Sequence, residues 1–294
     1  MNQDPTNNKP AEGASEKTAE TDVRHIEWIL TPKKTAETDF TPEYGDLSLL
    51  NETGILLSAV GRAQLRDMAT EYLDLLETST AIYEVNGDYA LGLFSSGWCR
   101  MMDTASRRLC HTNDNRAALN SGKWLCHESC WQEASLPAIK KGQAVDVACK
   151  GGIRLYAVPI WAGGEVVGAI NFGYGDPPTD EETLQALAEK YRLSIEELRK
   201  QAQTYQTRPR FIIDYARERI QKAALYLGYI IETKQAEDEL RRLKAHLETE
   251  VAEKTRELKE RVAELERFRD ATIEREFRIK ELRDEIARLK GGTS

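Results

Sequence analysis

The sequence has no long hydrophobic run and few cysteines. Its longest stretch without a charged residue, Tyr89 to Cys99, has eleven residues, whereas a membrane-spanning helix needs about 20 apolar residues. The polar start, Met1 to Asp22, lacks the apolar core of a secretory signal. Five cysteines in 294 residues are too few for a disulfide scaffold and suit a reducing compartment. These absences predict a cytoplasmic protein with no membrane span.

Positive charge is not in excess either. The chain carries 41 Lys and Arg against 49 Asp and Glu, a formal net charge of −8, which argues against nucleic acid as a partner. Motifs for a Walker-type phosphate loop, a nucleophile elbow or a Ser-His-Asp arrangement are missing. His246 lies in Lys-Ala-His-Leu-Glu, without the local sequence of a kinase phosphoacceptor. We therefore expect no enzyme activity from this chain itself.

Both ends of the chain differ in composition from its middle. Residues 1–45 are polar, with apolar side chains concentrated at Ile26 to Leu30. Such a segment buries too little surface to offset the entropy of ordering it, so we predict that 1–45 is disordered. Residues 234–290 contain no Pro or Gly and balance 16 acidic against 16 basic residues, which is typical of a long helix.

Apolar side chains in this C-terminal segment follow the 3-4 spacing of a coiled coil. Nine of thirteen seam positions between 247 and 289 are apolar, and a stripe of this length needs a partner helix to cover it. We predict a homodimer through 234–290, whereas a single helix stabilised by i,i+4 ion pairs is the alternative. The polar seam positions, where the pairing is weakest, are Lys254, Arg261, Thr272 and Arg275.

Residues 46–208 have the pattern of a compact α+β domain. Val60 to Leu76 is predicted as an amphipathic helix. Asn86-Gly87 and Gly163-Gly164 are hairpin signals, and a loop-rich segment separates the two hairpins. The predicted strands are Ala81–Val85, Tyr89–Phe94, Val145–Ala148, Ile153–Ile160 and Val166–Phe172. The sequence therefore predicts an antiparallel sheet of about five strands with flanking helices.

Helix signals follow the last predicted strand. Thr179 with Glu182, and Ser194 with Glu197, predict capping boxes for two short helices. Pro209 suits the first turn of a further helix, and apolar residues then recur at helical spacing as far as Ile231. We expect an exit helix at 209–233 that continues into the coiled coil.

All five cysteines lie between residues 99 and 149. Cys126 and Cys130 are four residues apart, so on a helical turn both sulfurs face one side. With Cys110 and Cys149 they form a candidate set of four soft ligands for zinc. The spacing differs from the usual C-x2-C pair, and free thiols also pack as small hydrophobic side chains. Zinc binding, thiol redox sensing and pocket lining therefore all stay open.

Four of the five tryptophans fall in or near the same segment. With neighbouring aromatic residues they predict an apolar cavity on one face of the sheet, and an ordinary core is the alternative. A buried indole N–H needs a hydrogen-bond partner, so this density beside Cys and His favours a pocket. The candidate ligand-binding residues are Trp98, Cys99, Trp124, Cys126, Cys130, Trp131, Cys149 and Tyr156.

These residues resemble the PocR-type sensory domain, a PAS/GAF-like ligand-binding module of bacterial transcription regulators and sensor histidine kinases. The resemblance covers roughly residues 50 to 235. Lys150 stands where that family has His, and Gly173-Tyr174-Gly175 replaces its Gly-Gln ending. The matching segments are Trp98 to Arg100, Cys126 to Trp131, Cys149 to Ile153, Pro159-Ile160 and Gly168 to Ile170.

The resemblance implies a PAS/GAF-like fold for 46–208 and a small organic molecule as ligand. From it we predict a cytosolic signal-transduction sensor of the kind found in two-component systems. Occupancy of the domain passes through the helix at 209–233 to the dimeric coiled coil, and from there to a kinase or another output partner. A zinc-stabilised adaptor and a thiol redox sensor are the alternatives, and the cofactor is left open, with zinc as the candidate.

Overall fold

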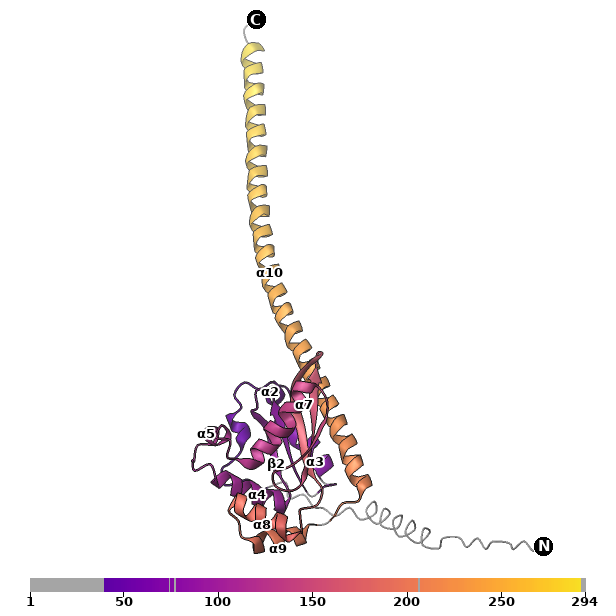
Figure 1. Cartoon of the computed structure of the whole chain (residues 1–294). Coiled ribbons are helices and arrows are strands. Elements are labelled where there is room, and N and C mark those ends of the chain that lie inside the picture. Colours follow the sequence, from indigo (N-terminus) through magenta and orange to yellow (C-terminus); the bar gives the residue numbers. More distant parts are fainter. Residues whose placement is uncertain (1–39, 74, 77, 206, 292–294) are drawn as a thin grey trace, which may run out of the picture. The chain divides into compact units, whose positions relative to one another are not determined.

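A computed structural model describes residues 40–291 except 74, 77 and 206 (Figure 1). The predicted disorder of residues 1–45 therefore lies almost entirely outside the described residues, as does the Ile26–Leu30 cluster. The chain forms two compact units, one up to Thr233 and one from Lys234 onward.

The first unit contains a five-stranded sheet with helices on both faces. This confirms the predicted α+β class with an antiparallel sheet, flanking helices and a long C-terminal helix. The elements in chain order are η1 (Leu47–Leu50), α2 (Ile55–Val60), α3 (Arg62–Leu73), β1 (Ser79–Glu84), β2 (Tyr89–Phe94), α4 (Gly97–Arg108), α5 (Asn115–Leu119), α6 (Leu125–His127), η2 (Glu128–Ser135), α7 (Leu136–Lys141), β3 (Val145–Ala148), β4 (Arg154–Ala162), β5 (Glu165–Tyr174), α8 (Glu181–Tyr191), α9 (Ile195–Thr204) and α10 (Arg210–Gly291).

The strands pair antiparallel in the order β2-β1-β5-β4-β3. Gly87, with φ 92°, lies in the turn between β1 and β2, and Gly163 and Gly164 turn β4 into β5 with φ 59° and 82°. Glycine adopts positive φ without the steric cost that other residues meet. Both hairpins predicted from the sequence are confirmed.

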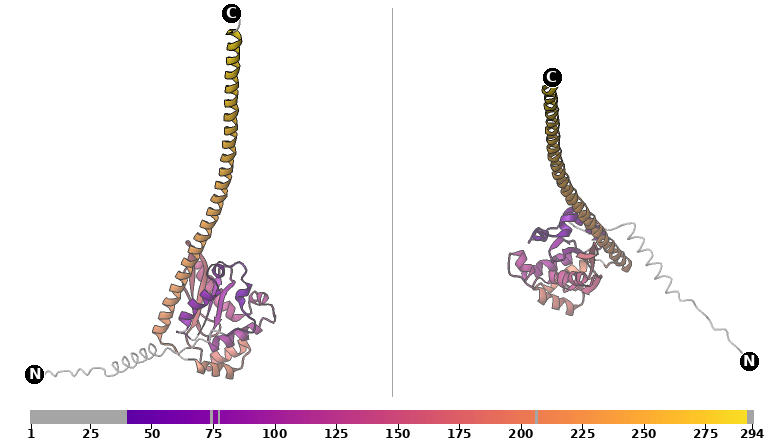
Figure 2. Two further views of the ribbon diagram at one scale, coloured as in Figure 1. Left: turned by 180° about the vertical axis from the view of Figure 1, so that it is seen from behind. Right: turned by 90° about the horizontal axis from the view of Figure 1, so that it is seen from above.

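Side chains alternate between the two faces of the sheet, as the pleat requires. On one face Ile82, Tyr156 and Phe172 pack with α2, α3 and the first part of α10. On the other face Ala81 and Tyr83 pack with residues of η1, α5 and η2, while Leu155 and Ala157 pack against η2 and α7. Figure 1 shows α10 and α7 on opposite sides of the strands, and Figure 2 gives the view from behind.

The cysteine-bearing segment is helical, whereas the sequence predicted loops. It comprises α4 to α7, and η2 within it is a π-helix. The predicted helix Val60–Leu76 corresponds to α3, Arg62–Leu73, and the unpredicted α2 precedes it across Gly61 with φ 84°. The helices α5, α6 and α7 have only three to six residues, which is too short for a periodic pattern to indicate a helix.

Of the two predicted capping boxes, one is confirmed. Ser194 Oγ accepts from the Glu197 N–H at 3.3 Å, and the Glu197 carboxylate accepts from the Ser194 N–H. The box of Thr179 with Glu182 is wrong, because Asp180 caps α8 and accepts from the Thr183 N–H at 2.8 Å. A carboxylate one residue later is a stronger acceptor for the free N–H groups of the first turn.

Helix α10 begins after Pro209, where the sequence places the start of an exit helix. Up to Thr233 its apolar side, including Ile212, Ile220 and Leu227, is buried against the sheet. From Lys234 onward most of its described side chains are exposed. Across the described part of the chain, no helix has the length and apolarity that crossing a membrane requires.

Candidate functional site

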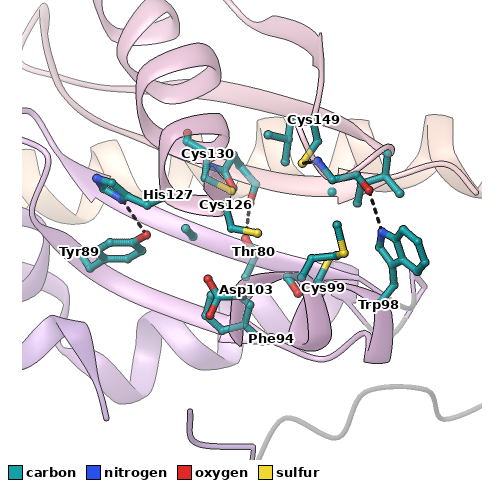
Figure 3. Close-up of a pocket in the computed structure, with 18 of the residues that line it drawn as sticks. Thr80, Tyr89, Phe94, Trp98, Cys99, Asp103, Cys126, His127, Cys130 and Cys149 are labelled. Atoms are coloured by element: carbon teal, nitrogen blue, oxygen red, sulfur yellow. Dashed lines mark hydrogen bonds between the residues drawn. The ribbon is translucent and has the colours of Figure 1, made fainter. Parts of the chain in front are cut away.

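A cavity of about 40 Å³ lies between the sheet and the helices α4, α6 and η2 (Figure 3). The sheet contributes side chains that share one face, among them Tyr83 of β1 and Leu155 of β4. Near the cavity, Asn171 and Gly173 of β5 occupy alternate positions on that face. Strand alternation therefore turns Tyr83, Leu155 and Asn171 toward the same side of the sheet, where the cavity lies.

Helix α4 forms one wall. Trp98, Cys99, Met102 and Asp103 line the cavity, and residues at this spacing share one helix face. Ser96 caps the helix, since its Oγ accepts from the Cys99 N–H at 3.3 Å. Trp98 Nε1 donates to the Gly151 carbonyl oxygen at 2.9 Å. This bond ties α4 to the loop between β3 and β4 and meets the need of the buried indole N–H.

Four thiols surround the cavity: Cys99 on α4, Cys126 and Cys130 on the α6–η2 segment, and Cys149 after β3 (Figure 3). Burial raises the pKa of Cys99 to about 12. Burial also raises the pKa values of Cys126 and Cys130 well above the usual range, and that of Cys149 above it. Thiols with raised pKa values stay protonated at neutral pH and react slowly. This argues against the thiol redox alternative.

Asp103 carries the one carboxyl group among the described residues that line the cavity. One carboxylate oxygen accepts from the Tyr44 hydroxyl at 2.6 Å, and the other accepts from Trp124 Nε1 at 2.8 Å. Burial raises the pKa of Asp103 to about 6, although both hydrogen bonds oppose that rise. Near neutral pH this group therefore offers a hydrogen-bonding oxygen to a bound molecule, and on mild acidification it becomes neutral.

His127 and Tyr89 form a second polar contact at the cavity. The Tyr89 hydroxyl and His127 Nδ1 lie 3.0 Å apart and share a hydrogen bond (Figure 3). Burial lowers the pKa of His127 to about 4, so the ring is neutral at pH 7. The Tyr89 ring also packs on Tyr83, with 4.5 Å between ring centroids. The arrangement orders the wall, and its groups suit recognition of a neutral molecule.

Five of the eight predicted ligand-binding residues meet at the cavity: Trp98, Cys99, Cys126, Cys130 and Cys149. The other three do not line it. Trp124 lies behind Asp103, and Trp131 packs on Tyr83 with 5.2 Å between ring centroids. Tyr156 lies on the opposite face of the sheet, where its hydroxyl accepts from Gln221 Nε2. Its neighbour Leu155 points to the cavity, so strand alternation excludes Tyr156.

The predicted zinc ligands are not assembled as one set. Cys110 lies apart from the cavity, near the Ser106 and Ala118 carbonyl oxygens at 3.7 and 3.9 Å. In residues 40–291, as far as they are described, no group of three or more His, Cys, Asp or Glu is arranged to hold a metal ion. Zinc binding by Cys110, Cys126, Cys130 and Cys149 stays a prediction that this geometry does not support.

Lys150, at the position where the resembled family has His, turns to the outside of the site. Its backbone N–H donates to Ser129 Oγ at 2.9 Å, and its Nζ forms an ion pair with Glu133. The adjacent Cys149 and Gly151 line the cavity, but Lys150 does not. Its side chain therefore helps to attach the β3–β4 loop to η2.

Sequence reasoning missed Met102, Asp103, His127, Tyr89 and Asn171. The first two follow Trp98 and Cys99 at four-residue spacing, so a helix recognised at 97–108 would have indicated them. His127 stands beside Cys126 in the sequence. Tyr89 and Asn171 carry no local signal, because only the pairing of distant strands and helices brings them to the cavity.

Comparison with known proteins gives one family match. A family model described as the sensory domain found in PocR matches residues 59–237. No curated protein matches the chain in sequence.

Three solved structures show limited similarity. A GAF domain/HD domain protein from Geobacter sulfurreducens is 10% identical, covers 51% of this chain and 99% of its own, and has a TM-score of 0.23. The C-terminal domain of the E. coli transcriptional regulator KdgR is 13% identical, covers 50% of this chain and 98% of its own, and has a TM-score of 0.20. An IclR homolog from Microbacterium sp. strain HM58-2 is 14% identical, covers 65% of this chain and 85% of its own, and has a TM-score of 0.23. TM-scores this low support no further conclusion.

Proposed function

Since this chain belongs to the family of the sensory domain found in PocR, we propose that it is a signal-transduction sensor for a small organic molecule. The molecule occupies the cavity between α4, η2 and the sheet. Its binding is relayed through α10 to a paired coiled coil, and from there to a kinase or another output partner. The cavity is the observation on which this proposal depends.

Size and polarity of the cavity support a small and largely apolar ligand. A single water needs about 10–15 Å³, and an engineered cavity of about 150 Å³ binds benzene, so about 40 Å³ suits a molecule of a few non-hydrogen atoms. Met102, Ile153 and Leu155 provide apolar walls, and Asp103 provides an acceptor for one hydroxyl or amine donor.

The sheet supports the proposed relay, because neighbouring residues of one strand face the cavity and α10. Leu155 lines the cavity, while Tyr156 packs under α10. Arg217 of α10 lies over the Tyr156 ring at 4.9 Å and forms an ion pair with Asp146 of β3. A ligand that binds one position of these strands better than another shifts the population of α10 positions with it.

Exposed apolar side chains support pairing of the C-terminal unit. Leu258, Leu265 and Phe268 are 62%, 67% and 72% exposed, although each occupies a seam position of the 3-4 repeat. A long stripe of exposed apolar residues is typical of a surface that another helix covers. A second copy of this chain provides a matching stripe.

Thermal-shift measurement of the full chain tests the ligand proposal. The panel consists of neutral organic molecules that have only a few non-hydrogen atoms, as the cavity volume of about 40 Å³ requires. A molecule that binds the native state raises the melting temperature in proportion to its occupancy. Gly151→Ala adds a methyl group 3.6 Å from Cys149 Sγ and 3.8 Å from the Met102 methyl carbon, without a clash. We expect this variant to lose the ligand-induced shift because the methyl group fills the cavity.

Tyr156→Phe is the matched control, since Tyr156 lies on the opposite face. It should keep the shift of the wild type. Binding at this cavity would be contradicted if no molecule of the panel raised the melting temperature of the wild type or of Tyr156→Phe. It would also be contradicted if Gly151→Ala kept the ligand-induced shift while Tyr156→Phe lost it.

A further inference from the structure

The segment from Leu125 to Lys141 is one run of helical residues with a π-helix inside it. The π-helix covers Glu128–Ser135, between α6 and α7. Its last bond runs from the Leu136 N–H to the Trp131 carbonyl oxygen, five residues back. π-Helical turns are rare and occur frequently at functional sites, and this one carries part of the cavity wall.

Residues spaced four apart show what the wider turn achieves. Cys126 and Cys130 line the cavity, and Ala134 and Ala138 are fully buried with Leu155 and Ala157 of the sheet. In an α-helix of 3.6 residues per turn, each step of four rotates the side chain by about 40°, or about 120° over three steps. The wider π turn offsets this rotation, so both ends of the segment face the sheet.

Pro137, just after η2, disfavours an α-helical conformation of the residues that precede it. Proline has no N–H, and in an α-helix its ring clashes with the carbonyl group four residues earlier, which here belongs to Glu133. Pro137 is only half-buried and does not line the cavity.

Asn171 of β5 forms hydrogen bonds with the π-helix from the sheet. Its side chain is 1% exposed, and its Nδ2 donates to the Cys130 carbonyl oxygen at 3.2 Å and to Ser135 Oγ at 2.8 Å. Its neighbours across β1 and β4 are Ala81 and Ala157, whose small side chains leave η2 room to approach. Both acceptors belong to the π-helix, so one buried amide holds it at two points.

We infer that Asn171 is a positioning residue whose amide holds η2 in the π-helical register and thereby keeps Cys126 on the cavity wall. Loss of this register turns the N-terminal end of the segment, with Cys126 and His127, away from the sheet and widens the cavity. The register of η2 therefore sets the size of molecule that the cavity admits. This consequence rests on the proposed ligand-binding function, whereas the register itself does not.

Site-resolved thiol labelling of the full chain tests the inference without any ligand. Native protein is treated with N-ethylmaleimide, and mass spectrometry follows each of the five cysteines. In Asn171→Leu we expect Cys126 to react at least about tenfold faster than in the wild type. Cys110 lies apart from the cavity and should keep its wild-type labelling rate, which distinguishes a register shift from general loss of structure.

Two further variants complete the experiment. Pro137→Ala restores the N–H and removes the ring, so it should also raise the labelling rate of Cys126 while leaving that of Cys110 unchanged. Ser135→Ala removes one of the two acceptors of Asn171 and keeps the Cys130 carbonyl, so it should raise the labelling rate of Cys126 by less than Asn171→Leu does. If Asn171→Leu accelerates all five thiols together, Pro137→Ala decides between a shifted register and a weakened fold.

The inference is overturned if Asn171→Leu leaves the labelling rate of Cys126 at its wild-type value. It is also overturned if all five thiols accelerate equally in both variants. Because no ligand is added, a chain that binds no small molecule can still show the expected labelling pattern, and the two proposals fail separately.

Discussion

At the residue scale, Asp103 and His127 are two buried ionisable groups on one cavity with opposite responses to pH. Burial raises the pKa of Asp103 to about 6 and lowers that of His127 to about 4. Asp103 binds its proton more tightly in the folded state, so its contribution to stability is lost as pH rises through 6. His127 binds its proton less tightly when folded, so its contribution is lost as pH falls below the ordinary histidine value toward 4. Between pH 4 and 6 the two contributions oppose each other.

Single substitutions should separate these contributions. When the pH is lowered from 7 to 5, Asp103→Asn should lose about 1 kcal/mol of unfolding free energy relative to the wild type, because it lacks the gain from protonating Asp103. His127→Gln should gain about 2 kcal/mol relative to the wild type over the same interval, because it avoids the cost of keeping a buried imidazole neutral. Urea denaturation at both pH values measures these differences.

Thr233→Ala is the control, since Thr233 carries no ionisable group and lies at an exposed position of α10. It should follow the wild type at both pH values. Equal pH dependence in all three variants would show that neither buried group titrates as described.

At the element scale, the contact between α10 and the β4–β5 hairpin depends on a residue without a side chain. A Cβ at Gly228 would collide with the Trp161 carbonyl oxygen. One turn later, the Glu232 carboxylate accepts from the Gly163 N–H at 2.6 Å. The helix therefore approaches the hairpin backbone as closely as glycine allows, which is consistent with the proposed relay.

Gly228→Ala should reverse the usual preference for alanine within a helix. Alanine favours an isolated helix by about 1 kcal/mol over glycine, but forcing a methyl group into a packed contact costs about 1–3 kcal/mol. We expect a net loss of unfolding free energy in urea denaturation. Thr233→Ala, at an exposed position of the same helix, should change it by less than about 0.5 kcal/mol. A Gly228→Ala protein more stable than the wild type would refute the close contact.

At the scale of the whole molecule, the proposed function needs two chains. The C-terminal unit has charged residues in ion pairs such as Lys254 with Glu257 at 3.0 Å, but it leaves its apolar seam exposed. Exposed pairs of this kind contribute little to stability. Burial of the seam by a second copy is the larger stabilising contribution available to this unit.

Light scattering at micromolar concentration should therefore give about twice the chain mass of 33.3 kDa. Replacing two seam residues, Leu258→Glu with Leu265→Glu, should reduce the mass to that of one chain, because both copies then place carboxylates in the seam. Ala263→Glu introduces a carboxylate between the seam positions, on the opposite side of the helix, and should leave the dimer intact. A wild-type chain that is monomeric under these conditions would remove the basis of the relay.

Local signals in the sequence were enough for the parts that short stretches determine. Asn86-Gly87 and Gly163-Gly164 predicted both hairpins because a tight turn with positive φ depends on the turn residues themselves. Ser194 with Glu197 predicted a cap for the same reason. The PocR resemblance and the long C-terminal helix could likewise be recognised from motifs and from a period that repeats along the chain.

The cavity was decided by contacts between distant residues. Trp98 and the four cavity cysteines were recognisable by type, but the pleat of β4 placed Leu155 at the cavity and Tyr156 on the other face. Asp103 and His127 became important only through burial, which the sequence does not state. The π-helix η2 accepts two hydrogen bonds from Asn171, which lies more than thirty residues further along the chain. The sequence therefore determined the elements, whereas packing between them determined the site, because desolvation and hydrogen bonding at a cavity arise only where several elements meet.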